Sequence, residues 1–341
     1  MKKWAAVALI FALLAGMTGC GRQEAIEPEA DKPKTLGLLV CTDQLTQSPS
    51  STMLAEGLES LGLPVVISTS DEYGEKTSAE RLDQLISDGA TLIWGSEPQL
   101  AEVILPAAKA HPDLAFVIHD AALPDLPSNV LAVSYHAWEG AFLAGYAAGM
   151  LTKTGKVGML GGLDEAVSQQ LEIGYNAGVQ YAAKALDRPV EVYTIYAGVC
   201  DDPDRGRQLA DIMYRDDCDV IFQAAGETGL GAIEEAKAQN KFIIGTDSDQ
   251  SHLAPEQMLL SVTSNMTTVT AEIGRAYLAG QFSGGRHLEQ GLAEGGVDIV
   301  VHDLVPAELA ETLAALKQQI ITGELKIPSD QAGYEAFLAE L

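Results

Sequence analysis

Basic residues are scarce in this chain of 341 residues, which has 21 lysines and arginines against 48 aspartates and glutamates. The resulting formal net charge is −27 at pH 7. The phosphate backbone of a nucleic acid would repel such a surface, so we expect neither DNA nor RNA as a partner. The acidity is typical of a surface that faces the outside of a cell, and it carries no information about a ligand.

Long apolar runs are missing beyond the amino terminus, and no later stretch is uncharged over the length that a membrane helix needs. The first nineteen residues have two lysines followed by an apolar segment, which is the layout of a secretory signal peptide. The sequence Met-Thr-Gly-Cys that ends at Cys20 resembles a bacterial lipobox with Met in place of the more usual Leu. We therefore expect a signal peptide over 1–19, a diacylglycerol on Cys20, and a flexible tether over 20–34.

Cysteine is rare as well. Besides Cys20, the chain contains Cys41, Cys200 and Cys218, an odd number that cannot be fully paired within one chain. A disulfide between Cys200 and Cys218 is one interpretation. Small buried thiols are the other, and the sequence favours them.

Patterns that carry catalysis or metal binding are also absent from the sequence. The six histidines are scattered, and there is no nucleophile elbow and no Ser/His/Asp arrangement. The carboxylates at 201, 202, 247 and 249 leave an enzyme as a minor hypothesis, because acid–base catalysis needs a paired geometry that a sequence cannot show. We expect a protein without catalysis, metal or cofactor.

What the chain does have, from residue 35 onward, is an alternation of short apolar strands and amphipathic helices, which predicts an α/β fold with parallel sheets. Five candidate strands lie between 35 and 135, and five more lie between 156 and 264. A chain of this length usually exceeds one compact core, so two similar lobes are expected. A ligand would then bind in the cleft between the lobes, at the carboxyl ends of the strands.

Several glycine-rich segments are specific enough to suggest a family: WEGAFLAG and TKTGKVG within 135–162, AAGETGLG at 224–231, GTDSDQ at 245–250 and TGELKIP at 322–328. Together they resemble the basic membrane protein family of bacterial solute-binding lipoproteins, whose best-understood members capture purine nucleosides for ATP-driven importers. The resemblance covers residues 35 to 328.

The resemblance implies a two-lobed type I periplasmic-binding-protein fold in which the chain crosses between the lobes three times. We expect an N-terminal lobe of 35–152 plus 265–289 and a C-terminal lobe of 153–264 plus 290–341. The helix expected in the first part of 135–162 is rich in Ala and Gly between 141 and 149. It should therefore lie close against a neighbouring sheet.

Two aspartates at strand ends are the first candidates for ligand contact. Asp247 follows the strand KFIIGT, and its carboxylate could accept hydrogen bonds from ligand hydroxyls; the alternative is a helix N-cap. Asp120 ends the strand AFVIHD and corresponds to an acidic cleft position of the family. Asp249 is expected to act as a cap or a local turn acceptor. In the AAGETGLG turn, Gly226 and Gly229 would let backbone amides approach the ligand.

At other positions the chain departs from the nucleoside-binding pattern of the family. Ser50 and Ser51 stand where a Phe and an Asn are expected, Cys200 stands in place of a second aromatic residue, and Ser264 replaces a Lys. Tyr135 and Trp94, at the ends of two strands, could supply substitute rings; core packing is the alternative for both.

The resulting prediction is a monomeric, lipid-anchored receptor on the extracytoplasmic face of the cell membrane. It would bind a small polar ligand, with a nucleoside as the first candidate, and deliver it to an ABC permease. The alternatives are a sensor or regulatory lipoprotein of the same family and a receptor for a solute other than a nucleoside. A DNA-binding repressor of this fold is excluded, because an export signal occupies the place of a helix-turn-helix.

Overall fold

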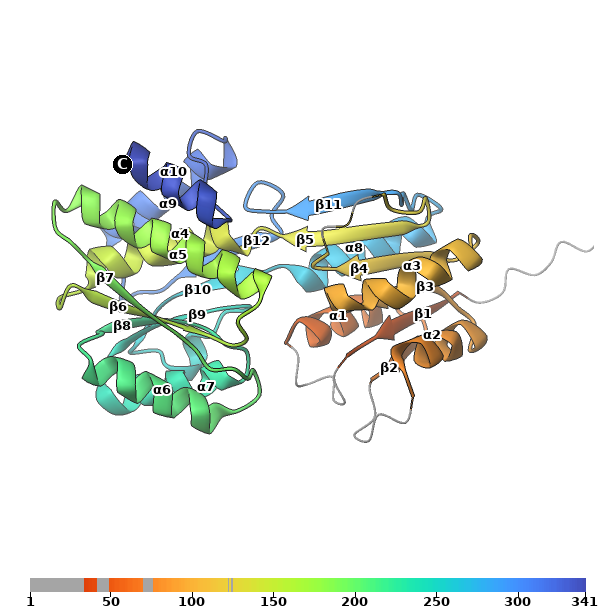
Figure 1. The fold of residues 1–341 in the computed structure, drawn as a ribbon, viewed down its shortest axis with the longest axis horizontal. Helices are drawn as coiled ribbons and strands as arrows, with labels where there is room; N and C mark the ends of the chain where they lie inside the picture. Colours follow the sequence, from red (N-terminus) through yellow and green to blue (C-terminus); the bar gives the residue numbers. More distant parts are fainter. Residues whose placement is uncertain (1–33, 42–48, 70–75, 122, 124) are drawn as a thin grey trace, which may run out of the picture. The chain divides into compact units, whose positions relative to one another are not determined.

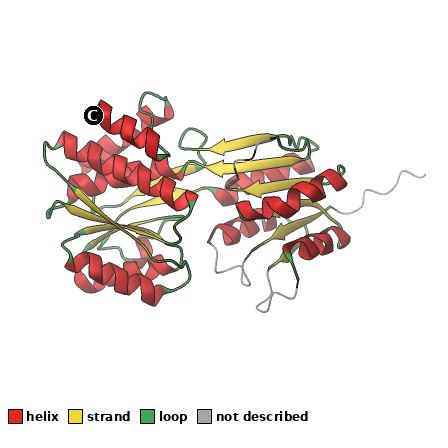
Figure 2. Ribbon diagram, viewed as in Figure 1, coloured by secondary structure: helices red, strands yellow, loops and turns green. Residues whose placement is uncertain are grey.

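The computed structural model describes residues 34–41, 49–69, 76–121, 123 and 125–341. This part of the chain confirms the predicted α/β class: it forms two six-stranded sheets, each with helices on both faces (Figures 1 and 2). We call each sheet with its helices a lobe. The predicted signal peptide and Cys20 lie outside the described residues.

The sheet of the first lobe has the order β11-β5-β4-β3-β1-β2, and all its neighbouring strands are parallel. Its strands are β1 (Thr35–Leu39), β2 (Val65–Ser68), β3 (Ala90–Gly95), β4 (Ala115–His119), β5 (Val130–Tyr135) and β11 (Arg286–Gln290). The sequence predicted the first five. It missed β11 because this edge strand is polar and largely exposed, so it lacks the apolar pattern that identifies a buried strand.

The sheet of the second lobe has the order β12-β10-β9-β8-β6-β7. Its strands are β6 (Lys156–Gly161), β7 (Glu191–Tyr196), β8 (Val220–Ala224), β9 (Phe242–Gly245), β10 (Met258–Ser264) and β12 (Val297–Val301). The strand β12, which the sequence analysis also missed, runs antiparallel to β10. The second sheet is therefore parallel except at this edge.

Helices cover both faces of each sheet because side chains alternate along buried strands. In the first lobe, α1 (Pro49–Glu59) and α8 (Met266–Leu278) pack on one face, and α2 (Ser78–Ser87) and α3 (Ala101–Ala110) on the other. In the second, α4 (Ala137–Leu151), α5 (Ala166–Ala185) and α9 (Ala307–Ile321) oppose α6 (Pro203–Arg215) and α7 (Thr228–Gln239), while α10 (Gln331–Glu340) packs on α5. None of the helices in the described ranges could cross a membrane.

The small residues of α4 allow a close contact with the neighbouring helix α5 in addition to the predicted contact with a sheet, since α4 also packs on β10 and β12 and a Cβ at Gly140 would lie 2.5 Å from the Val262 side chain of β10. A Cβ at Gly145 would lie 2.0 Å from the carbonyl oxygen of Tyr175 in α5, and one at Gly178 would lie 2.0 Å from that of Phe142. The two backbones can approach this closely only where glycine is present. The predicted division at residue 152 assigned α4 to the first lobe, whereas α4 packs with α5, β10 and β12 of the second.

The cysteines are free thiols in the described part of the chain. Cys218 is buried, and Cys41 and Cys200 are half-buried. The interpretation as small buried thiols fits Cys218 best, and the alternative disulfide with Cys200 is not formed.

Candidate ligand-binding site

Asp120 directly follows β4, and Asp247 lies two residues beyond the end of β9. Both residues have a left-handed backbone conformation. Their φ angles are 51° and 69°. This conformation is uncommon for residues other than glycine, although aspartate and asparagine tolerate it best. Such outliers are often found where a binding site fixes the chain. Both side chains are partly buried.

The charge of Asp120 acts on the Asp247 carboxylate although the two residues follow strands of different sheets. Burial raises the pKa of Asp247 from 3.8 to about 6, and the negative charge of Asp120 adds to this rise. Like charges near each other disfavour the ionised form. The site therefore presents two carboxylates whose mutual repulsion a hydrogen-bond donor or a cation would relieve.

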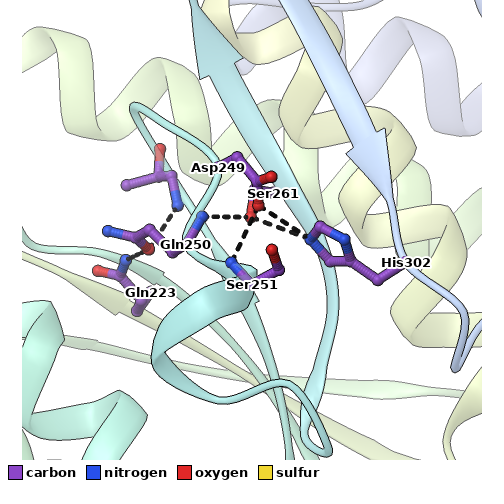
Figure 3. A network of polar contacts seen from close by, with 7 residues as sticks. Gln223, Asp249, Gln250, Ser251, Ser261 and His302 are labelled. Atoms are coloured by element: carbon purple, nitrogen blue, oxygen red, sulfur yellow. Dashed lines mark hydrogen bonds and ion pairs between the residues drawn. The ribbon is translucent and has the colours of Figure 1, made fainter.

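A network of polar side chains, with Gln223 and Ser261 buried at its base, holds the loop that carries Asp247 (Figure 3). The amide nitrogen of Gln223 on β8 donates to Gln250 Oε1 at 2.6 Å, and the Gln250 backbone N–H donates to Ser261 Oγ at 3.2 Å. Ser261 Oγ lies 3.4 Å from His302 Nε2, which is 3.5 Å from Asp249. Gln223 and Ser261 are fully buried, so the network ties the loop to strands β8 and β10 of the sheet.

Asp249 has the local role that the sequence suggested for it. Asp249 Oδ1 accepts the backbone N–H of Ser251 at 2.9 Å, so Asp249 is the local turn acceptor. The side chain of Asp247 has no helix to cap, because the short 3-10 turn that follows begins at Ser251. Its carbonyl oxygen accepts the backbone N–H of Ser264 at 3.0 Å. This bond brings Ser264, at the end of β10, to the same place.

Gly226 and Gly229 are explained by packing within the second lobe. Gly226 has a φ of 58°, and a Cβ there would lie 3.0 Å from the carbonyl oxygen of Cys200. A Cβ at Gly229 would lie 1.6 Å from Gln223 Oε1. The neighbouring Thr228 is the first residue of α7, and its hydroxyl accepts the Asp202 N–H at 2.9 Å.

Cys200, which the sequence analysis placed at an aromatic position of the resembling family, lies beside the AAGETGLG turn. The backbone N–H of Thr228 donates to its carbonyl oxygen at 3.0 Å. Burial raises the pKa of the Cys200 thiol, and the nearby charges of Glu165, Asp201 and Asp247 raise it slightly further. The half-buried thiol is a small apolar group beside this turn.

The two aromatic residues that the sequence suggested as substitute rings lie in the first lobe, and both are buried. Trp94 on β3 is 0% exposed and belongs to the hydrophobic core, as the alternative interpretation predicted. Tyr135 at the end of β5 is 6% exposed, and its ring lies 5.2 Å from that of His119. His119 Nε2 is 3.1 Å from Asp120 Oδ2. Stacking on a ligand is therefore not available to Trp94 in this conformation.

Ser51, at the start of α1, is fully buried and donates to Glu97 Oε1 at 3.3 Å. The other oxygen of Glu97 accepts the Cys41 N–H at 3.1 Å and the Ser96 hydroxyl. Glu97 was not among the predicted site residues. It lies two residues beyond the end of β3, as Asp247 lies two residues beyond the end of β9, so the same strand-end rule applies to it.

Other supporting residues were overlooked for a different reason. Gln223 stands in an otherwise apolar strand, DVIFQAA, and a buried polar residue in such a strand is a signal for a hydrogen-bond network. His302 carries no such signal, because it follows the strand β12 that the sequence did not reveal. Within the described residues, no three His, Cys, Asp or Glu side chains are arranged to hold a metal ion.

Comparison with known proteins identifies the family. The model of the family described as "ABC transporter substrate-binding protein PnrA-like" matches residues 34–331. The chain belongs to this family. It is 36% identical over 265 residues to Basic membrane protein A of Borreliella burgdorferi, covering 76% of this chain and 77% of that one. It is 30% identical to Basic membrane protein B of the same organism, covering 98% of each chain.

The fold of this PnrA-like chain also matches solved structures. A solute-binding protein of an ABC transporter system from Aeropyrum pernix K1 aligns with a TM-score of 0.76 and 24% identity, covering 90% of this chain and 97% of that one. The predicted two-lobed binding-protein fold is thus confirmed, and the chain is a member of a substrate-binding family of ABC transporters.

Proposed function

We propose that this PnrA-like protein binds a small, uncharged ligand with vicinal hydroxyls, a nucleoside, and delivers it to an ABC permease. The observation that carries the proposal is the pair of partly buried carboxylates, Asp120 and Asp247, one from each sheet. Each carboxylate accepts hydrogen bonds from hydroxyl or amino groups, and one carboxylate can hold two neighbouring hydroxyls. A ligand bound by both would connect the two lobes and favour the closed arrangement.

The same pair disfavours an anionic ligand. Asp247 already holds its proton more tightly than an ordinary aspartate because of burial and the charge of Asp120. A phosphate or carboxylate placed between them would add a third negative charge in a partly desolvated site. The proposal is therefore limited to nucleosides and excludes nucleotides.

We propose further that Cys20 carries the lipid that holds the protein at the extracytoplasmic face of the membrane. The lipobox-like sequence supports this, and so does the polar segment between Cys20 and the first described strand, which can act as a tether. Cell fractionation tests it: the wild-type protein should be found with the membranes and Cys20→Ser should not. Equal membrane fractions for both would refute lipidation at this position.

A sensor or regulatory role is the second candidate. It is supported by the departures at Ser50, Cys200 and Ser264 from the family's nucleoside-binding residues. Such a protein would keep the ligand site and lose the transport partner. Uptake of a radiolabelled nucleoside by cells with and without the gene separates the two roles, because only a transport receptor changes the uptake rate.

The binding proposal is tested by a thermal-shift screen of the full-length protein in detergent against nucleosides, nucleotides, bases and sugars. A ligand at a hundred times its dissociation constant adds about 2.7 kcal/mol to the stability. Asp247→Asn is the test variant. Asp217→Asn is its matched control, because Asp217 also has a left-handed backbone, with φ 67°, and is exposed. A nucleoside shift that survives in Asp247→Asn would refute the proposed contact.

A further inference from the structure

Four buried polar atoms without a hydrogen-bond partner lie in one region of the first lobe. Among the described residues of this region, these atoms are Trp94 Nε1, His119 Nδ1, His119 Nε2 and Tyr135 Oη. His119 is 1% exposed, and Tyr135 is 6% exposed. Native proteins leave few buried polar atoms unpaired, so a group of them calls for a physical explanation.

Strand register places the three side chains on the same face of the sheet. Trp94 pairs with Val117, two residues before His119 on β4, and His119 pairs with Val133, two residues before Tyr135 on β5. Side chains two residues apart on a strand point to the same face. Trp94, Val117, Val133 and Tyr135 accordingly belong to one core cluster, which lies under α1 and α8.

This row of side chains ends at Asp120. His119 Nε2 is 3.1 Å from Asp120 Oδ2, without the alignment of a hydrogen bond, and the Tyr135 ring lies 5.2 Å from the His119 ring. Burial, and to a lesser extent the charge of Asp120, raises the pKa of Tyr135 well above its ordinary value. The Tyr135 hydroxyl therefore keeps its proton and remains a hydrogen-bond donor.

We propose that the Tyr135 hydroxyl is a ligand-contacting donor beside Asp120, and that His119 is the positioning residue that orients Asp120. This inference rests on the proposed function, and it deepens that function by naming what the first lobe recognises. The Tyr135 hydroxyl has no hydrogen-bond partner among the described residues, and a ligand bound at the neighbouring Asp120 can supply the acceptor. Because Asp120 repels an anion, the acceptor is uncharged: a carbonyl oxygen or a ring nitrogen of a nucleobase.

The recognition is then divided between the lobes. Asp247 accepts hydrogen bonds from the hydroxyls of the ligand, and Tyr135 donates one to its base. A bare sugar would satisfy Asp247 and leave the Tyr135 donor unpaired, so it should bind more weakly than a nucleoside.

The test is a calorimetric titration of the full-length protein with the nucleoside that gives the largest thermal shift among inosine, guanosine, adenosine and uridine. Tyr135→Phe keeps the ring and removes only the hydroxyl, and it should weaken binding by at least about fivefold. Tyr175→Phe is the matched control. Its hydroxyl is also buried without a partner, but it lies in the second lobe, where the ring stacks on Phe222.

Stability measurements exclude a purely structural role for the hydroxyl. Removing an unpaired buried polar atom should leave the stability of the free protein unchanged or raise it, in both tyrosine variants. At His119, the conservative change His119→Gln keeps a donor for Asp120 and should retain more affinity than His119→Leu. Equal affinities of these two variants would refute the positioning role.

The outcomes separate this inference from the proposed function. If the wild type binds a nucleoside, Asp247→Asn does not, and Tyr135→Phe binds as the wild type does, the hydroxyl contact is refuted and the receptor remains. If the wild type binds none of the four nucleosides, the proposed function is refuted, and the inference fails with it.

Discussion

Asp247→Asn should stabilise the free protein at neutral pH while it weakens ligand binding. The pKa of Asp247 is about 6 in the folded protein against an ordinary value of 3.8. Each pKa unit corresponds to about 1.4 kcal/mol, so the ionised carboxylate costs at most about 3 kcal/mol of folding free energy. Because the side chain retains some contact with solvent, we expect a gain of roughly 1–3 kcal/mol for the variant.

The pH dependence of this gain has a definite sign. A raised carboxyl pKa means that the folded state holds the proton more tightly than the unfolded state. The stability that protonated Asp247 contributes is then lost as the pH rises from about 4 to about 6, and none of this contribution remains above that range. The difference between Asp247→Asn and the wild type should be near zero below pH 4 and largest above pH 6.

The assay is thermal or urea unfolding of both proteins without ligand between pH 3.5 and 8. Asparagine tolerates the left-handed backbone at this position, so the change introduces no new strain. Asp217→Asn serves again as the control, and its stability should follow that of the wild type. A variant that is no more stable than the wild type at pH 7.5 would contradict the reasoning.

Three further changes test the supporting structure. The Glu139 carboxylate raises the pKa of His136, so His136→Gln should cost stability at pH 5.5 and less as the pH rises toward 8, in the same unfolding assay. Gly229→Ala pushes a Cβ into Gln223 and should cost about 1–3 kcal/mol, with weaker nucleoside binding by calorimetry; unchanged stability would refute this packing. Gly145→Ala meets the backbone of α5 and should cost at least about 2 kcal/mol, whereas an unaffected unfolding midpoint would contradict the contact between α4 and α5.

Most of the strands that the sequence predicted are buried. Eight of the ten contain fully buried apolar residues, and burial on both faces leaves a clear pattern. The edge strands β2 and β7 are only half-buried, and they were predicted from their β-branched and aromatic residues. The edge strands β11 and β12 were missed. Their sequences, RHLEQ and VDIVV, are short and partly exposed, and pairing with a neighbouring strand determines their structure more than their own composition does.

The packing partner of α4 was not predicted, although the sequence contains a signal for it. A run of alanine and glycine indicates a close approach of backbones, but it does not identify the neighbour. Gly145 and Gly149 contact α5, whose own Gly174 and Gly178 complete the fit. Small residues on both helices at matching intervals would have indicated a helix pair.

At the candidate site, the strand-end rule found the two aspartates and missed their supports. Asp120 and Asp247 are visible in the sequence because each follows an apolar strand. Gln223, Gln250 and Ser261 come together only in the folded sheet, since they belong to β8, the loop after β9, and β10. The burial of Trp94 was equally hidden, because an aromatic residue at a strand end can face either the core or a ligand.

The central claim, that Asp120 and Asp247 hold one uncharged ligand together, is tested most directly by calorimetric titration of the best-binding nucleoside into four proteins: wild type, Asp120→Asn, Asp247→Asn and the double variant. We predict that each single change weakens binding at least about tenfold, and that the nucleoside binds more tightly than its 5′-phosphate. Affinities of all four proteins within a factor of two, or tighter binding of the phosphate, would contradict the claim.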